Sequence, residues 1–255
     1  MVRQISTLAW MTYKEAAHGR LIWVIGFSVL LLVAAVEFAG EVIVSGVAAL
    51  QAGMLGWGMR WLGVITISLF CINSVAREAN DRVGELFVAA PVRREVLYLG
   101  RMLGLVAIAA IFAGIAFASA LIYVEPLVAL SWALSLWMEL CIVVAFALLV
   151  VASGSPVVAS MLLTTAFYLV GRSIGALHAM ANGPSFDPRS AFDNFLVISV
   201  DVLSWIMPPL HRFASADWLV SGVFDGGLLL QLFSCLVYLL LLGSVTVLEI
   251  YRRQY

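Results

Sequence analysis

Six long apolar runs constrain the fold of this chain more than any other feature of its sequence. A helix needs about 20 apolar residues to cross the ~30 Å of hydrocarbon in a bilayer. The runs that reach this length cover residues 21–43, 58–76, 102–124, 129–151, 157–177 and 228–250. Backbone groups in lipid must be hydrogen-bonded within the protein, so we predict an all-α polytopic membrane protein with six transmembrane helices.

The composition supports this prediction. Only 11% of the 255 residues are charged, against about 25% in soluble domains, so too few polar groups exist to cover a water-facing exterior. The net charge of −1 gives no reason to expect a nucleic-acid partner. Cys71, Cys141 and Cys235 each fall inside an apolar run without CxxC spacing. We therefore expect buried thiols, no disulfide and no metal site, with membrane lipid as the surrounding medium.

A seventh apolar segment, residues 195–207, is too short to span and contains Asp201. It ends at Pro208-Pro209, so an interfacial or re-entrant helix is the better interpretation. Ser190 has the chemistry of its N-cap. The sequence ADWLVSGVF at 216–224 indicates a second short helix. We thus predict two short outer helices between spans five and six.

Lysine and arginine set the orientation. With six spans and the N-terminus inside, ten basic residues lie on the inner side and four on the outer side. The inner set is Arg3, Lys14, Arg20, Arg77, Arg82, Arg93, Arg94, Arg101, Arg252 and Arg253, and the outer set is Arg60, Arg172, Arg189 and Arg212. This bias predicts that both termini are cytoplasmic.

The segment between spans two and three gathers charge. Residues 77–101 hold nine of the 29 charged residues in 25 positions. Apolar residues recur at helical spacing over 77–90 and Pro91 follows, which predicts a short helix with one charged face. An ordinary positive-inside loop is the alternative. The mixture of four acids with five arginines favours docking to a protein.

This segment resembles the corresponding loop of type-2 ABC transporter permeases, the six-span subunits of ABC exporters. The family pattern is Ala-Arg-Glu at the end of span two, a Glu six residues before Pro-Val, a basic residue, and Gly-Lys or Gly-Arg opening span three. The matching residues are Ala76-Arg77-Glu78, Glu85, Pro91-Val92, Arg93 and Gly100-Arg101. Arg82-Val83 stands where the family often has Gly-Thr. The specific motif covers residues 76–101, and the span layout covers the whole chain.

The resemblance implies a single permease domain over residues 1–255, with a cytoplasmic coupling helix that docks on an ABC ATP-binding subunit. The implied ATPase-coupling residues are Arg77, Glu78, Asp81, Arg82, Glu85, Arg93 and Arg94. The chain has no GxxxxGK[ST] motif, so we expect no catalytic residues and no cofactor on it. ATP and Mg²⁺ belong to two copies of the partner ATPase. A second permease copy, as a homodimer or with a related permease, and a prokaryotic cytoplasmic membrane complete the expectation.

The first 20 residues form an amphipathic segment. Its apolar stripe consists of Ile5, Leu8, Ala9, Thr12 and Ala16. The family reading is an N-terminal interfacial helix that also touches the ATPase, and the alternative is a simple lead-in to the first span.

Three charged residues lie inside predicted spans and are functional candidates by default. Glu37 and Arg172 lie at similar depth in the outer thirds of spans one and five, so an ion pair between them is geometrically allowed. Snorkelling or a structural pair is the alternative to substrate contact. Glu139 lies near the middle of span four, and both a protonated helix–helix contact and a water-facing site remain open.

The sequence GRSIG puts Gly171 and Gly175 at the spacing that allows close helix approach. By the resemblance they are candidates for the dimer interface, and packing within one subunit is the alternative. A second functional hypothesis is a stand-alone secondary transporter or channel that uses Glu37, Glu139 and Arg172.

Overall fold

The computed structural model describes residues 2–19, 21–42, 46–80, 94–181, 191–223 and 227–252. Every regular element in these ranges is a helix: α1 (Val2–His18), α2 (Leu21–Val42), α3 (Val47–Asn80), α5 (Arg94–Ala120), α6 (Pro126–Ala152), α7 (Val157–Ala181), α8 (Ala191–Ile206), the 3-10 helix η1 (Leu210–Arg212), α9 (Ala216–Ser221) and α10 (Leu228–Arg252). Six of them, α2, α3, α5, α6, α7 and α10, are long and apolar enough to cross a membrane. The chain is therefore an integral membrane protein, and the six predicted spans are confirmed.

The helices extend beyond the predicted spans. Hydropathy marks the part of a helix that matches hydrocarbon, whereas backbone hydrogen bonding continues into the polar flanks. The largest difference is α3, which begins at Val47, eleven residues before the predicted start at 58. Its early turns pack against α9, because Gly53 and Gly56 leave room for Val220 and Leu219.

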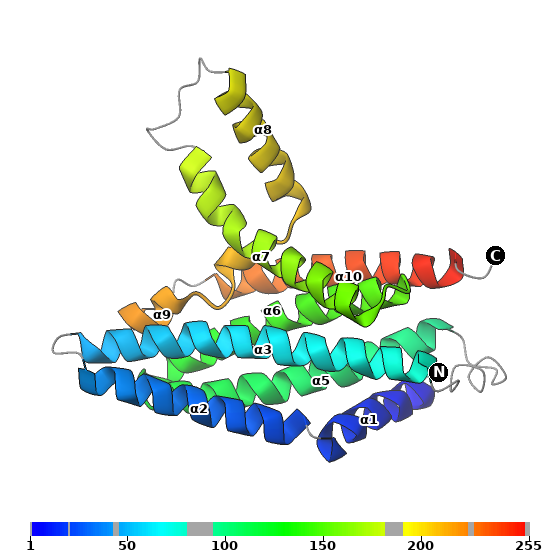
Figure 1. Ribbon diagram of the computed structural model, residues 1–255, viewed down its shortest axis with the longest axis horizontal. Coiled ribbons are helices and arrows are strands. Elements are labelled where there is room, and N and C mark those ends of the chain that lie inside the picture. Colours follow the sequence, from blue (N-terminus) through cyan, green and yellow to red (C-terminus); the bar gives the residue numbers. More distant parts are fainter. Residues whose placement is uncertain are drawn as a thin grey trace.

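The long helices α2, α3, α5, α6 and α10 lie side by side, with both termini at one end of the bundle (Figure 1). We call this end the terminal end and the opposite end, which carries α9 and the start of α10, the distal end. The centre is α6, which is buried on nearly every side. The edges are α2 and α10, where Trp23, Phe27 and Leu240 are largely exposed, as lipid-facing residues are.

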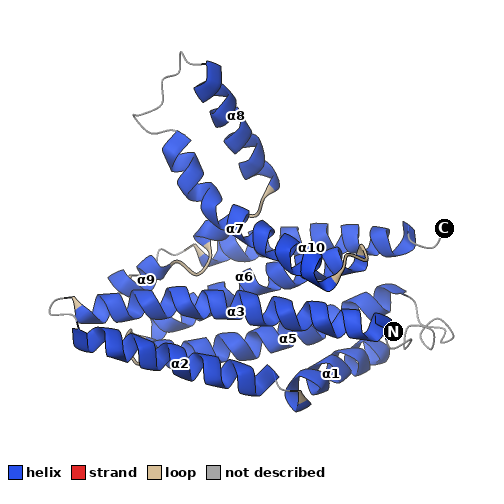
Figure 2. Cartoon of the chain, in the orientation of Figure 1, coloured by secondary structure: helices blue, strands red, loops and turns tan. Residues whose placement is uncertain are grey.

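The second half of α7 leaves the bundle, and α8 returns beside it (Figures 1 and 2). Residues 176–180 of α7 are all exposed, which agrees with this departure. The predicted helix before Pro208-Pro209 is confirmed as α8, although its proposed cap Ser190 lies outside the described residues. The chain then re-enters the bundle through η1, where Leu210, Phe213 and Ala214 are buried.

The second predicted short helix is confirmed as α9. Ser215 caps its start by accepting a hydrogen bond from the Asp217 backbone N–H, and Gly222 ends it with a left-handed φ of 66°. This pair of caps fixes where the chain turns toward α10.

The N-terminal helix α1 lies along α5. Close approach requires Gly104, because a Cβ there would lie 2.7 Å from the Thr12 Cβ. Thr12 and Ala16 are buried and Trp10 is exposed, as the predicted apolar stripe requires. The segment is therefore helical as predicted, and its interfacial position stays a prediction.

The predicted 77–90 helix falls largely outside the described residues, which exclude 81–93 and with them Asp81, Arg82, Glu85 and Arg93. Its first residues, Arg77 and Glu78, belong to the last turn of α3, which continues to Asn80 without a break. Arg94 is the first residue of α5.

Candidate functional site

The most unusual feature of the bundle is a buried ionic cluster in its distal half. Arg60 is the fourteenth residue of α3 and Glu139 the fourteenth of α6. Both helices start at the distal end, so at 1.5 Å per residue both side chains begin ~20 Å from their helix starts. Arg172 joins them from α7. Three helices thus bring one acid and two bases to the same depth.

Glu139 is fully buried between the two arginines. Its Oε2 lies 3.7 Å from Arg60 Nε, and its Oε1 lies 3.8 Å from an Arg172 terminal nitrogen. No described residue donates a hydrogen bond of ordinary geometry to either carboxylate oxygen, and the Tyr168 hydroxyl of α7 also interacts with this carboxylate. Charge attraction, which is strong in a low-dielectric interior, therefore holds this carboxylate.

The two guanidinium groups donate hydrogen bonds to backbone carbonyl oxygens of η1 and of the turn that follows it. Arg60 donates to the Ala214 carbonyl oxygen. Arg172 donates to the carbonyl oxygens of Leu210 at 2.6 Å and Phe213 at 2.7 Å. These oxygens compensate the second positive charge that Glu139 alone cannot neutralise. The cluster consequently ties a returning loop to the centre of the bundle.

Ala214 has an unusual backbone for a non-glycine residue, with a φ of 44°. Such a conformation costs on the order of 1–3 kcal/mol and persists when its surroundings determine it. Here the carbonyl oxygen also accepts from Trp132 Nε1 at 3.2 Å, and the N–H donates to Ser135 Oγ at 2.8 Å. Side chains of α3 and α6 therefore hold this residue from both sides.

The network continues to α10. The Ser135 hydroxyl donates to Gln231 Oε1 at 2.6 Å, and Gln231 Nε2 donates to the Arg212 carbonyl oxygen at 2.7 Å. Tyr238 donates its hydroxyl to the Met207 carbonyl oxygen at 3.0 Å. The segment from Met207 to Ala214 is thus hydrogen-bonded by side chains of four long helices.

Sequence reasoning missed Arg60. It was counted at the outer end of a span that begins at 58, but Arg60 contacts Glu139 of span four and has only 4% of its surface exposed. The available signal was the rule that a charge inside an apolar helix is a functional or structural site.

The Glu37–Arg172 ion pair that similar depth allowed does not form between these two residues, because Arg172 pairs with Glu139 instead. Glu37 is exposed on α2, where its carboxylate accepts from the Tyr123 hydroxyl at 2.6 Å and from Gln51 Nε2 at 3.3 Å. Depth along two helices therefore did not predict which of their faces meet.

Gly171 and Gly175 pack within the chain. A Cβ on Gly171 would lie 3.0 Å from Leu210 Cδ1, and one on Gly175 would lie 2.6 Å from His211. These glycines let η1 approach α7, as the intrasubunit alternative requires. Their part in a dimer stays a prediction.

A second charged group lies at the terminal end. The Glu15 carboxylate of α1 accepts from Arg77 at 2.8 Å and from the Ser74 hydroxyl at 2.8 Å, both on α3. These contacts fasten α1 beside the charged 77–101 stretch.

No group of three or more potential metal ligands occurs in the described part of the chain. The predicted thiols Cys71, Cys141 and Cys235 are all buried and free. His178 Nδ1 of α7 lies 3.3 Å from Asp201 Oδ1 of α8.

Comparison with protein-family models and with curated proteins gives no match for this chain.

Proposed function

We propose that this chain is the membrane-spanning permease subunit of an ATP-driven ABC exporter. A separate ABC ATP-binding subunit, in two copies, hydrolyses ATP with Mg²⁺, and the permease couples this to movement of a substrate out of the cytoplasm or the membrane. Both termini are cytoplasmic, in a prokaryotic inner membrane, as the distribution of basic residues favours.

The observation that carries the proposal is the grouping of charge at the terminal end. The 77–101 stretch connects α3 to α5, and α1 is fastened to both helices, through Glu15 to Arg77 and through Thr12 to Gly104. A force applied to this stretch therefore acts on α1, α3 and α5 together. Such a joint is what a permease without its own P-loop needs in order to receive motion from a partner.

The contacts refine the coupling residues. The Arg77 guanidinium donates a hydrogen bond to the Glu15 carboxylate, so we assign Arg77 to holding α1 in position. Contact with the ATPase then falls to the residues that follow it, Glu78 to Arg94, with Glu85 at the family's glutamate position.

The alternative of a stand-alone secondary transporter receives less support. It relies on Glu37, Glu139 and Arg172 acting together, but Glu37 bonds Tyr123 and Gln51, apart from the other two. Arg172 is committed to two backbone carbonyl oxygens as well as to Glu139. These contacts favour a structural role for the cluster over a substrate or proton site.

The proposal is tested by replacing Glu85 with Arg. A charge-assisted hydrogen bond of ~1.5–3 kcal/mol to the ATPase is lost, so we expect its occupancy on the permease to fall about tenfold or more. The measurement is copurification of the ATPase from membranes, together with ATPase stimulation and permease abundance.

Glu125→Arg is the matched control, because Glu125 is an exposed acid at the distal end. It should leave copurification unchanged. Normal copurification and coupling in Glu85→Arg, at normal permease abundance, would contradict the proposal.

A further inference from the structure

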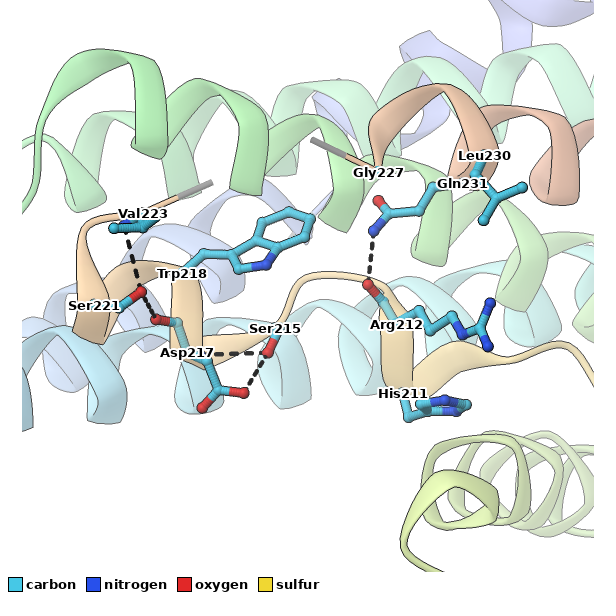
Figure 3. A pocket seen from close by; sticks show the side chains of 10 residues that line it. All are labelled: His211, Arg212, Ser215, Asp217, Trp218, Ser221, Val223, Gly227, Leu230 and Gln231. Carbon is cyan, nitrogen blue, oxygen red and sulfur yellow. Dashed lines mark hydrogen bonds between the residues drawn. The ribbon is translucent and has the colours of Figure 1, made fainter. Parts of the chain in front are cut away.

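A pocket of about 600 Å³ lies at the distal end between η1, α9 and the first turn of α10 (Figure 3). This volume is within the ~300–1,000 Å³ range of small-molecule sites. The pocket has charged lining residues, Arg212 and Asp217, and apolar ones, Trp218, Val223 and Leu230. It therefore offers both charged and apolar contacts, as an amphiphilic ligand requires.

The depth of the pocket is that of lipid headgroups. α10 begins at Leu228 and has 25 residues, so it is ~37 Å long and exceeds the ~30 Å of hydrocarbon. This length allows its first turn, which contributes Leu230 and Gln231 to the pocket, to lie at the boundary between hydrocarbon and water. A tryptophan lining the pocket suits the same boundary.

The two charged side chains lie on different sides of the pocket, with Asp217 beside Ser215 and Arg212 below Gln231 (Figure 3). Both are exposed. Gln231 donates to the Arg212 backbone carbonyl oxygen, which does not involve the guanidinium, and Asp217 accepts from Ser215 Oγ at 2.9 Å. Guanidinium binds phosphate in a bidentate manner, and a carboxylate accepts hydrogen bonds from an ammonium group.

The third charge-bearing residue of the pocket is His211. Burial, followed by Arg212, Arg172 and His178, lowers its pKa. Among the described lining residues, Arg212 and Asp217 are therefore the charged pair on which the site depends.

An apolar strip runs from the pocket along α10. Leu230, Phe233, Val237 and Leu241 follow at helical spacing and are all exposed. Leu230 belongs both to this strip and to the pocket. Acyl chains of a lipid can lie along it while the headgroup enters the pocket.

We propose that this pocket binds the headgroup of a zwitterionic phospholipid that carries a primary ammonium group. The phosphate pairs with Arg212, the ammonium donates to Asp217, and the acyl chains cover the strip from Leu230 to Leu241. This site does not depend on the exporter function proposed above, because it requires only that the six apolar helices cross a bilayer.

The test is native mass spectrometry of the full-length protein, titrated in detergent with phosphatidylethanolamine, phosphatidylcholine or phosphatidylglycerol. We expect phosphatidylethanolamine to bind most tightly. Arg212→Gln should weaken binding of all three lipids by about tenfold, and Asp217→Asn should remove the preference for phosphatidylethanolamine. Val223→Trp, which adds bulk at an exposed lining position, should weaken binding without changing any charge.

Arg252→Gln and Glu125→Gln are the matched controls, since both residues are exposed near helix ends and outside the pocket. Both should bind lipid as the original chain does. The proposal is overturned if no preference for phosphatidylethanolamine exists, if the three pocket variants bind normally, or if the controls lose binding equally. Displacement of the lipid by equimolar inorganic phosphate would also overturn it, because the site would then be a simple anion site.

Discussion

Arginine–glutamate pairs occur in both halves of the bundle, and the closer pair is the more exposed one. At the terminal end Arg77 and Glu15 are 2.8 Å apart, with 67% and 27% of their side-chain surfaces exposed. In the distal half Glu139 is 3.7 and 3.8 Å from its two arginines, and its own side chain is fully buried. Water screens the first pair, whereas the second lies in a low-dielectric interior. Burial, more than distance, therefore decides which pair the fold depends on.

The largest expected effect is that of Glu139→Leu. This change leaves the buried Arg60 and the partly exposed Arg172 without their shared carboxylate, and removing one partner of a buried charge pair costs about 3–5 kcal/mol of unfolding free energy. Denaturant unfolding in mixed micelles measures it. Glu37→Gln is the control, because Glu37 is an exposed carboxylate on α2. Equal stability of the Glu139 and Glu37 variants would break the contrast between buried and exposed pairs.

Ser135→Ala should come next. It removes the hydroxyl that accepts from Ala214 N–H and donates to Gln231 Oε1, so two buried polar groups lose this partner at a cost of about 1–3 kcal/mol. Ser131→Ala is a close control on the same helix, since within the described part of the chain Ser131 donates to the Val128 carbonyl oxygen of its own helix. The same measurement should give Ser131→Ala an unfolding free energy close to that of the original chain. If Ser131→Ala lowered the unfolding free energy more than Ser135→Ala does, the proposed role of the Ser135 network would be contradicted.

Arg77→Gln should have a smaller effect on stability. An exposed ion pair is worth about 0–1 kcal/mol and weakens in salt. We expect the unfolding free energies of this variant and the original chain to converge as salt concentration rises. If Arg77→Gln instead lowered the unfolding free energy by more than about 2 kcal/mol at every salt concentration, the terminal end would depend on its Arg77–Glu15 pair as the distal half depends on Glu139.

The smallest effect concerns pH at His211. Burial, with Arg212, Arg172 and His178 nearby, lowers its pKa below the unfolded value of about 6.5. The folded state thus disfavours the imidazolium, so this contribution to stability is present above about pH 6.5 and is lost as pH falls through the folded pKa. His211→Gln should reduce the acid-induced fall in the thermal midpoint, and His178→Gln should not. An identical acid response in the original chain and His211→Gln would contradict this.

Local patterns predicted much of the fold. The six spans, α8 before Pro208-Pro209 and the short α9 all follow from runs of apolar residues and helix-ending residues that are neighbours in sequence. The start of α3 was missed because its first turns contain glycines and moderate hydropathy. Their helical state is supported by α9, a partner from more than 150 residues further along the chain.

By itself the sequence determined that the chain is helical and has six helices long and apolar enough to cross a membrane, because hydrogen bonding in lipid and helical length are local requirements. Only the tertiary structure decided that Glu139 lies between Arg60 and Arg172, and that Gly171 and Gly175 receive η1. Helix rotation and the path of a returning loop fix these contacts. Both depend on side-chain packing summed over several helices, which no single segment encodes.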